Sequence, residues 1–280
     1  MTPTAPVMYD DTLAPGAISD ELRPVIDGFG MEKNCRELFE NGWTIVENVA
    51  TRDFNDQLRT RILECLRVTD DKGEGVGSMM LHKAPVFAQA TMNPKLLAMA
   101  EFSVGRGFLL MRTAATVKPE GGTGMAMHND MNWFPAPFPA HNMVLTACWA
   151  TDGFSRAGGS TRVVPRSHLL KRHPTHAEIA AETDTVAIEC PPNSAVLWDG
   201  GVWHSSGRRE LPGQRVVAHI SYIRLAARPV DDYTPWADEL VAVHGPVMAQ
   251  LLGQDDMLQC QAGGFTDSAK VVTTFNNAKR

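Results

Sequence analysis

The chain has 280 residues, 44% of them hydrophobic, and a formal net charge of −6. This length suits one large domain or two small ones, and because no linker separates two, we expect a single domain over residues 1–280. The acidic balance and the lack of a basic stripe argue against a nucleic-acid partner. No apolar run approaches the ~18 residues of a membrane span, and the N-terminus lacks a signal-peptide pattern. We therefore expect a cytoplasmic protein without a membrane partner. The sequence is compatible with a homo-oligomer but carries no signal for one.

The first third of the chain mixes helices and strands. Residues 1–20, rich in Pro, Thr and Asp, predict an N-terminal arm. The hydrophobic periodicity predicts helices over 32–42, 51–68 and 93–105 and a strand over 43–49. Gly42 is expected to end the first helix and Thr51 to cap the second. The glycine-rich loop 70–78 follows no strand, which argues against a phosphate-binding loop, and we expect a flexible lid over 70–83.

From residue 107 the pattern changes to short apolar segments separated by Gly, Pro, Asn and Asp. These segments are 107–119, 144–150, 161–165, 184–190, 194–198 and 215–225. Many short strands at close spacing predict a mainly β fold with flanking helices, either a barrel or a double-sheet jelly roll, with its core over 107–225. The tail 230–280 reads as a mixed extension that is helical over 237–252.

The sequence contains two His-x-acid pairs, whereas roughly one is expected by chance. His176 and Glu178 follow Pro174 and Thr175, which predict a helix start, and residues two apart on a helix point in different directions. His128 and Asp130, in GMAMHNDMNWFP, follow a glycine turn and read as a strand, where residues two apart share a face. This second pair is therefore a candidate metal site, although a buried histidine beside a chance carboxylate remains the alternative.

His204, in VLWDGGVWHSSG, is the candidate third ligand, at the end of a strand-like segment. Two imidazoles and one carboxylate form the facial triad of non-haem iron(II) oxygenases, which leaves open positions for a cosubstrate and dioxygen. Arg215 begins the next apolar strand. A guanidinium facing into a sheet is costly unless a carboxylate meets it, and its fork matches a carboxylate with two hydrogen bonds.

These residues, together with NWFP, Trp149 in TACWA, AGGSTRVVPRSH at 157–168 and WHSSG, resemble the phytanoyl-CoA dioxygenase family of iron(II)- and 2-oxoglutarate-dependent oxygenases over roughly residues 36–226. The resemblance implies a double-stranded β-helix of the cupin-like, jelly-roll type. It implies iron(II) held by His128, Asp130 and His204, with O2 and 2-oxoglutarate as further reactants. Arg215 would bind the distal carboxylate of 2-oxoglutarate, and Trp149 and Ser206 would line the cosubstrate pocket.

The implied reaction is hydroxylation of an unactivated C–H bond with release of succinate and CO2; desaturation and rearrangement are alternatives within the family. Asp130 argues against halogenation, because halogenases of related fold carry a small residue there. Met125 stands where several relatives carry a cosubstrate-binding glutamine, which leaves open how the metal-side end of 2-oxoglutarate is held. The methionines and aromatics of 125–134 predict a small, largely apolar metabolite as substrate.

Several other polar residues have a simpler role beside a functional one. His168, His173 and His176 suggest a second metal site, but loop histidines beside basic residues are expected to face solvent. His219 is either a neighbour of the metal site or a core histidine. Ser205 and Ser206 lack the Gly-x-Ser-x-Gly elbow of a hydrolase. The competing function is a metal-binding cupin-like isomerase or hydrolase, or a non-catalytic binding module, neither of which needs Arg215. The five widely spaced cysteines are expected to be reduced.

Overall fold

Two antiparallel β-sheets form the centre of the protein in a computed structural model that describes residues 16–255. The large sheet has the strand order β1-β8-β5-β10-β3-β2, and the small sheet has the order β4-β9-β6-β7. The strands of the large sheet are β1 (Trp43–Val46), β2 (Gly75–Ser78), β3 (Leu109–Pro119), β5 (Val144–Ala150), β8 (Ser194–Asp199) and β10 (Gln214–Ile223). Those of the small sheet are β4 (Met125–His128), β6 (Thr161–Val163), β7 (Val186–Ala187) and β9 (His204–Ser206).

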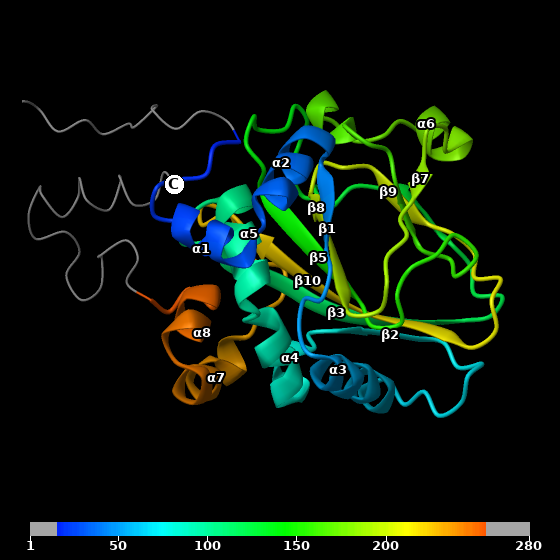
Figure 1. Ribbon diagram of the computed structural model, residues 1–280, viewed down its shortest axis with the longest axis horizontal. Coiled ribbons are helices and arrows are strands. Elements are labelled where there is room, and N and C mark those ends of the chain that lie inside the picture. The colour runs from blue at the N-terminus through cyan, green and yellow to red at the C-terminus, as the bar shows by residue number, and fades with distance from the viewer. Residues whose placement is uncertain (1–15, 256–280) are drawn as a thin grey trace, which may run out of the picture.

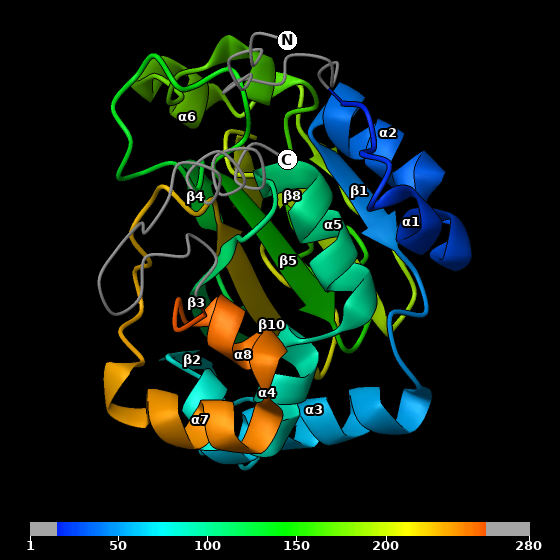
Figure 2. The ribbon, with the colours of Figure 1, turned by 90° about the vertical axis from the view of Figure 1, so that its left-hand side faces the viewer.

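Helices cover the outer face of the large sheet, on the side away from the small sheet (Figure 1). A view turned by 90° places α3, α4 and α7 together at one end of the molecule and α6 at the other (Figure 2). The helices are α1 (Arg23–Phe29), α2 (Glu32–Asn41), α3 (Arg52–Cys65), α4 (Pro85–Thr91), α5 (Pro94–Val104), α6 (His176–Ala181), α7 (Ala237–His244) and α8 (Pro246–Leu251).

The residues predicted to begin and end helices do so through local hydrogen bonds and backbone conformation. Thr51 caps α3 because its hydroxyl accepts a hydrogen bond from the Phe54 N–H, and Gly42 ends α2 with a left-handed φ of 84°. The Thr175 hydroxyl and Glu178 form a capping box at the start of α6. The predicted helix over 237–252 is divided into α7 and α8 at Gly245, because Pro246 cannot continue the hydrogen bonding of α7.

Alternation along the strands of the large sheet separates two cores. Leu145, Ala147 and Trp149 of β5 pack with the helices in the larger hydrophobic cluster. Cys148 and Ala150, from the opposite face of the same strand, pack with residues of the small sheet and its loops, such as Val163 and Val202. The sheet is therefore buried on both faces in this region, and its inner face looks into the space between the sheets.

The predicted mainly β fold with flanking helices is confirmed, and the two facing antiparallel sheets make the jelly roll. Several predicted elements differ in detail. The predicted loop 70–78 ends in an edge strand, β2, and the segment 184–190 contributes only the two-residue strand β7. The helices α1 and α4 were not predicted. Residues 1–15 of the predicted arm and 256–280 of the predicted extension lie outside the described residues, and the single-domain division stays a prediction.

Candidate metal centre and adjoining cavity

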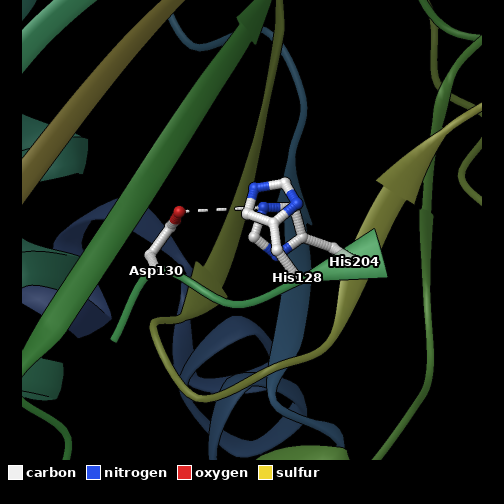
Figure 3. Close-up of side chains that lie close together, drawn as sticks. All are labelled: His128, Asp130 and His204. Carbon is white, nitrogen blue, oxygen red and sulfur yellow. Dashed lines mark ion pairs between the residues drawn. The ribbon is translucent and has the colours of Figure 1, made fainter. Parts of the chain in front are cut away.

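His128, Asp130 and His204 lie together between the two sheets (Figure 3). His128 ends β4 and His204 begins β9, and these two residues are directly paired across the small sheet. The potential ligand atoms of the three residues lie within 4.8 Å of one another, and His204 Nε2 is 3.8 Å from Asp130 Oδ1. Within the described part of the chain, this is the one cluster of His, Cys, Asp or Glu side chains with metal-binding geometry.

Asp130 does not lie on the predicted strand, because β4 ends at His128. The chain turns after the strand, and the Asp130 N–H donates a hydrogen bond to the Gly200 carbonyl at 2.8 Å. This backbone contact, rather than strand alternation, brings the carboxylate toward the two imidazoles. The predicted proximity of the pair is met, but the predicted reason for it is wrong.

Both histidines are oriented by hydrogen bonds to backbone carbonyls. Nδ1 of His128 lies 2.9 Å from the Ala126 oxygen, and Nδ1 of His204 lies 3.1 Å from the Val202 oxygen. A carbonyl oxygen can only accept, so Nδ1 carries a proton in each ring, and in the neutral form of such a ring Nε2 has a free lone pair. Burial lowers the pKa of His204, which also favours the neutral ring. Neutral imidazoles with a free Nε2 are the form that binds a metal ion.

The carboxylate of Asp130 is held by two side chains that the sequence analysis did not single out. Its Oδ2 accepts hydrogen bonds from the Thr146 hydroxyl at 2.6 Å and from the Trp198 indole N–H at 2.8 Å. Burial raises the pKa of Asp130, but attraction to His204 and these hydrogen bonds outweigh it, so the pKa lies below its usual value. Asp130 is therefore an anion whose Oδ1 remains available, which completes a donor set of two nitrogens and one oxygen suited to iron(II).

A cavity of about 420 Å³ adjoins the three residues. Alternate residues of β3 and β10 form much of its wall, including Ala114, Thr116, His219 and Ser221. His219 is thus a cavity residue, and burial beside Arg215 lowers its pKa to about 4, so its ring is neutral at neutral pH. The cavity connects the candidate metal centre with buried cationic side chains.

Arg215 lines this cavity and is only 6% exposed. One terminal nitrogen donates a hydrogen bond to the Gly159 carbonyl, and the guanidinium lies over the Phe154 ring at 5.2 Å. Its Nε is buried without a hydrogen-bond partner, and no described carboxylate forms an ion pair with it. A buried cation in this state requires an anion to be fully satisfied.

Ser206 and Lys118 lie beside Arg215 at the same part of the cavity. Lys118 is directly opposite Arg215 in the β3–β10 register and is 8% exposed. Its ammonium donates to the Ser206 hydroxyl at 3.0 Å and to the Gly207 carbonyl at 2.9 Å. Ser206 was predicted from the sequence and Lys118 was not, although strand periodicity over 107–119 places Lys118 on the same face as Thr116.

Trp149 is not part of the cavity, contrary to expectation. It is fully buried on the helical face of β5, where its indole N–H donates to Asn55 at 3.1 Å and its ring packs against Phe54. Strand alternation explains this placement, because the residues of β5 that face the small sheet are the even-numbered ones, such as Thr146. Met125 does line the cavity and is 57% exposed.

Of the three histidines considered for a second metal site, His168 and His173 make hydrogen bonds elsewhere, and His176 is exposed as predicted. The ring of His168 lies 3.2 Å from the Phe39 carbonyl and that of His173 lies 3.0 Å from the Phe134 carbonyl. His168 is buried rather than facing solvent as predicted, and this burial lowers its pKa to about 4. The four described cysteines, Cys35, Cys65, Cys148 and Cys190, are free.

Comparisons with known proteins agree with this geometry. The profile of the phytanoyl-CoA dioxygenase (PhyH) family matches residues 36–215. Dioxygenase af480 of Aspergillus fumigatus is 22% identical over 275 residues, covering 92% of this chain and 88% of the relative. The epimerase SnoN from nogalamycin biosynthesis, solved with Fe3+, alpha-ketoglutarate and nogalamycin RO, has a TM-score of 0.60 at 19% identity, covering 71% of this chain and 85% of SnoN. EctD from S. alaskensis, solved with 2-oxoglutarate and 5-hydroxyectoine, has a TM-score of 0.58 at 19% identity, covering 82% of this chain and 86% of EctD.

Proposed function

Because this chain belongs to the phytanoyl-CoA dioxygenase family, we propose that it oxidises a C–H bond of a small-molecule substrate, with hydroxylation as the outcome. The protein is an enzyme of the 2-oxoglutarate-dependent dioxygenase class, and its cofactors are iron(II), 2-oxoglutarate and O2. In hydroxylation, one oxygen atom of O2 enters succinate and the other enters the product, while 2-oxoglutarate loses CO2. Membership of this family argues against the non-catalytic module and the metal-dependent hydrolase, whereas an isomerase-type reaction such as epimerisation stays an alternative.

One observation carries the proposal: the same cavity holds three metal-ligand side chains and, apart from them, a buried arginine without an anionic partner. His128, Asp130 and His204 would hold iron(II), which supplies the activation of O2 when bound. Arg215 would bind the distal carboxylate of 2-oxoglutarate through its guanidinium fork. The cavity and 2-oxoglutarate match chemically, because the 2-oxo acid end of this molecule can bind a metal and its other end is a carboxylate that Arg215 can bind.

The remaining residues around the pocket have roles that follow from their contacts. Ser206 receives hydrogen bonds from Lys118 and from the Met125 N–H, so its hydroxyl proton is free to donate to a carboxylate. Thr146 and Trp198 hold one oxygen of Asp130 and leave the other for the metal. Met125 offers no side-chain donor to the metal-side carboxylate of 2-oxoglutarate, so that end depends on the metal and on other residues.

The test is iron-dependent formation of succinate from 2-oxoglutarate, with Asp130→Ala as the diagnostic variant. Removal of the carboxylate leaves two imidazoles as the only side-chain ligands, which hold iron(II) poorly. We expect the variant to lose iron binding and turnover while its far-UV circular dichroism stays near that of wild type, with a lower melting temperature because the Trp198 indole N–H loses its acceptor. Thr161→Val, which alters the cavity wall without removing a ligand, is the matched control. Wild-type amounts of succinate from Asp130→Ala under iron-limited conditions would show that the triad is wrongly assigned.

No described helix is long and apolar enough to cross a membrane. The cytoplasmic location and the lack of a nucleic-acid partner stay predictions from composition. Product analysis by mass spectrometry would separate the proposed hydroxylation, which adds one oxygen atom, from desaturation, which removes two hydrogens, and from epimerisation, which leaves the mass unchanged.

A further inference from the structure

A third cationic side chain, Arg112, faces the cavity and has no role in the proposed binding of 2-oxoglutarate. It lies on β3, on the face that also carries Ala114 and Thr116, and it lines the cavity. Its Nε is buried without a hydrogen-bond partner, and no described residue forms a hydrogen bond or an ion pair with its guanidinium. Unlike Lys118, it is not satisfied by the protein.

Arg112 lies at the metal end of the cavity. The β3–β10 register pairs Arg112 with Ser221 and Lys118 with Arg215. Six residues along a strand separate Arg112 from Lys118, which at ~3.3 Å per residue is about 20 Å between their backbones. Ser221 contacts the Thr146 hydroxyl at 3.0 Å, and Thr146 donates to Asp130. The strand position of Arg112 is therefore level with the metal ligands, well away from the part of the cavity where Arg215 lies.

An unpaired guanidinium beside a reaction site favours a particular kind of ligand. Guanidinium groups bind carboxylates and phosphates with two parallel hydrogen bonds. Arg112 is half-buried, and its buried Nε lacks such a partner, which is costly. If Arg215 binds the distal end of 2-oxoglutarate, the anion that faces Arg112 is either an acidic group of the substrate or the metal-side carboxylate of 2-oxoglutarate. The metal ion itself neutralises the metal-side carboxylate of 2-oxoglutarate, which favours the substrate as the source of the anion that faces Arg112.

We propose that Arg112 is a specificity residue that binds a carboxylate or phosphate group on the substrate. This proposal rests on the proposed function and gives its substrate a chemical class: a small molecule with an anionic group and an apolar carbon frame. The apolar frame would contact the wall near Ala114 and Met125, and the anion would hold it with one C–H bond toward the metal. The largely apolar substrate predicted from the sequence would therefore also carry a negative charge.

The experiment compares wild type with Arg112→Gln and with Arg36→Gln, whose arginine is exposed on α2 outside the cavity. Anaerobic protein loaded with iron(II) and 2-oxoglutarate is titrated by calorimetry with paired probes: octanoate and octanamide, phenylacetate and phenylacetamide. We expect wild type and Arg36→Gln to bind at least one acid about tenfold or more tightly than its amide, and Arg112→Gln to lose that preference. Arg112→Lys, which keeps the charge but not the fork, should retain part of it.

A second measurement identifies the source of the anion. Titration of 2-oxoglutarate into the anaerobic iron-loaded variants should give the wild-type dissociation constant for Arg112→Gln. A raised constant would assign Arg112 to the metal-side carboxylate of 2-oxoglutarate and overturn the substrate role. If no acid bound more tightly than its amide to wild type, the proposal would also fail. Neither readout needs turnover, so a failure here is distinct from absent succinate formation, which would reject the proposed function itself.

Discussion

At the scale of single residues, Arg215 is the side chain expected to bind the second carboxylate of a dicarboxylate in this pocket. Removal of one partner of a buried charge pair typically costs ~3–5 kcal/mol, because the other charge is left alone. At ~1.4 kcal/mol per factor of ten, this is a loss of roughly 10² to 10³ or more in affinity. We expect Arg215→Ala to bind iron(II) normally but to need far more 2-oxoglutarate, with Arg215→Lys in between.

The affinity is measured by titrating 2-oxoglutarate into anaerobic iron-loaded protein and following the metal-to-ligand charge-transfer band. Arg36→Gln is the control for loss of one arginine at an exposed position. An unchanged dissociation constant in a folded Arg215→Ala protein would remove this arginine from the pocket.

Lys118 should make 2-oxoglutarate binding depend on pH. Burial and the nearby charge of Arg215 lower the pKa of Lys118 to about 8, with Arg162 acting in the same direction and Glu74 opposing it. Below pH 8 the ammonium attracts the bound carboxylate; above pH 8 the free protein has lost this proton, and binding must take it up again. The dissociation constant for 2-oxoglutarate should therefore rise between pH 7 and pH 9, by no more than about tenfold per pH unit for one proton.

The Lys118→Met protein tests this origin of the pH dependence. We expect weaker binding at pH 7 and a flatter profile up to pH 9, whereas Lys33→Met, at an exposed position on α2, should keep the wild-type profile. The same charge-transfer titration serves as the measurement. A wild-type slope that survives in Lys118→Met would assign the pH dependence to another group.

At the scale of elements, the edge strand β2 connects the predicted lid with the cavity. β2 pairs with β3 on one side only, and Glu74 and Val76 line the cavity. Val76 is 77% exposed, so there is apolar surface here that a bound ligand would cover. We expect amide hydrogen exchange in residues 70–83 to slow when iron(II) and 2-oxoglutarate are added without oxygen, and to slow further with a substrate. Exchange in α3 should not change. Unaltered exchange in 70–83 would contradict the lid.

Elements with strong local signals were predictable, and those that depend on long-range pairing were not. The helix ends at Thr51 and Gly42 and the strand that carries Arg215 depend only on neighbouring residues in the chain. They can therefore be predicted from the sequence. Residues 75–78 contain two glycines and form a strand only because β3 supplies hydrogen bonds. Asp130 reaches the site through a contact with Gly200, seventy residues away in the chain, which no local pattern could reveal.

At the scale of the whole molecule, the two faces of the large sheet have different roles: one lines the cavity and the other packs against helices. The inner faces of β3 and β10 carry Arg112, Lys118, Arg215 and His219, and the outer faces pack against helices. Periodicity of two predicts that residues segregate in this way, but it does not say which face looks toward which layer. The family resemblance placed Trp149 at the cosubstrate, whereas the alternation of β5 places it under the helices.

Substitution of Trp149 should therefore separate stability from cosubstrate binding. Trp149→Phe keeps most of the ring packing but removes the indole N–H, which leaves the Asn55 side-chain oxygen buried without this donor. A lost partner of this kind costs about 1–3 kcal/mol in the free energy of unfolding. We expect denaturant unfolding to show that loss, while the dissociation constant for 2-oxoglutarate stays within about twofold of wild type, since the indole lies across the sheet from the cavity. Arg215→Ala should show the reverse pattern, with weakened binding in a protein of near wild-type stability, because the removed guanidinium is a buried charge with no anionic partner. A Trp149→Phe protein that kept its stability but bound 2-oxoglutarate tenfold more weakly would place the indole at the pocket after all, and would contradict the assignment of the two faces of the sheet.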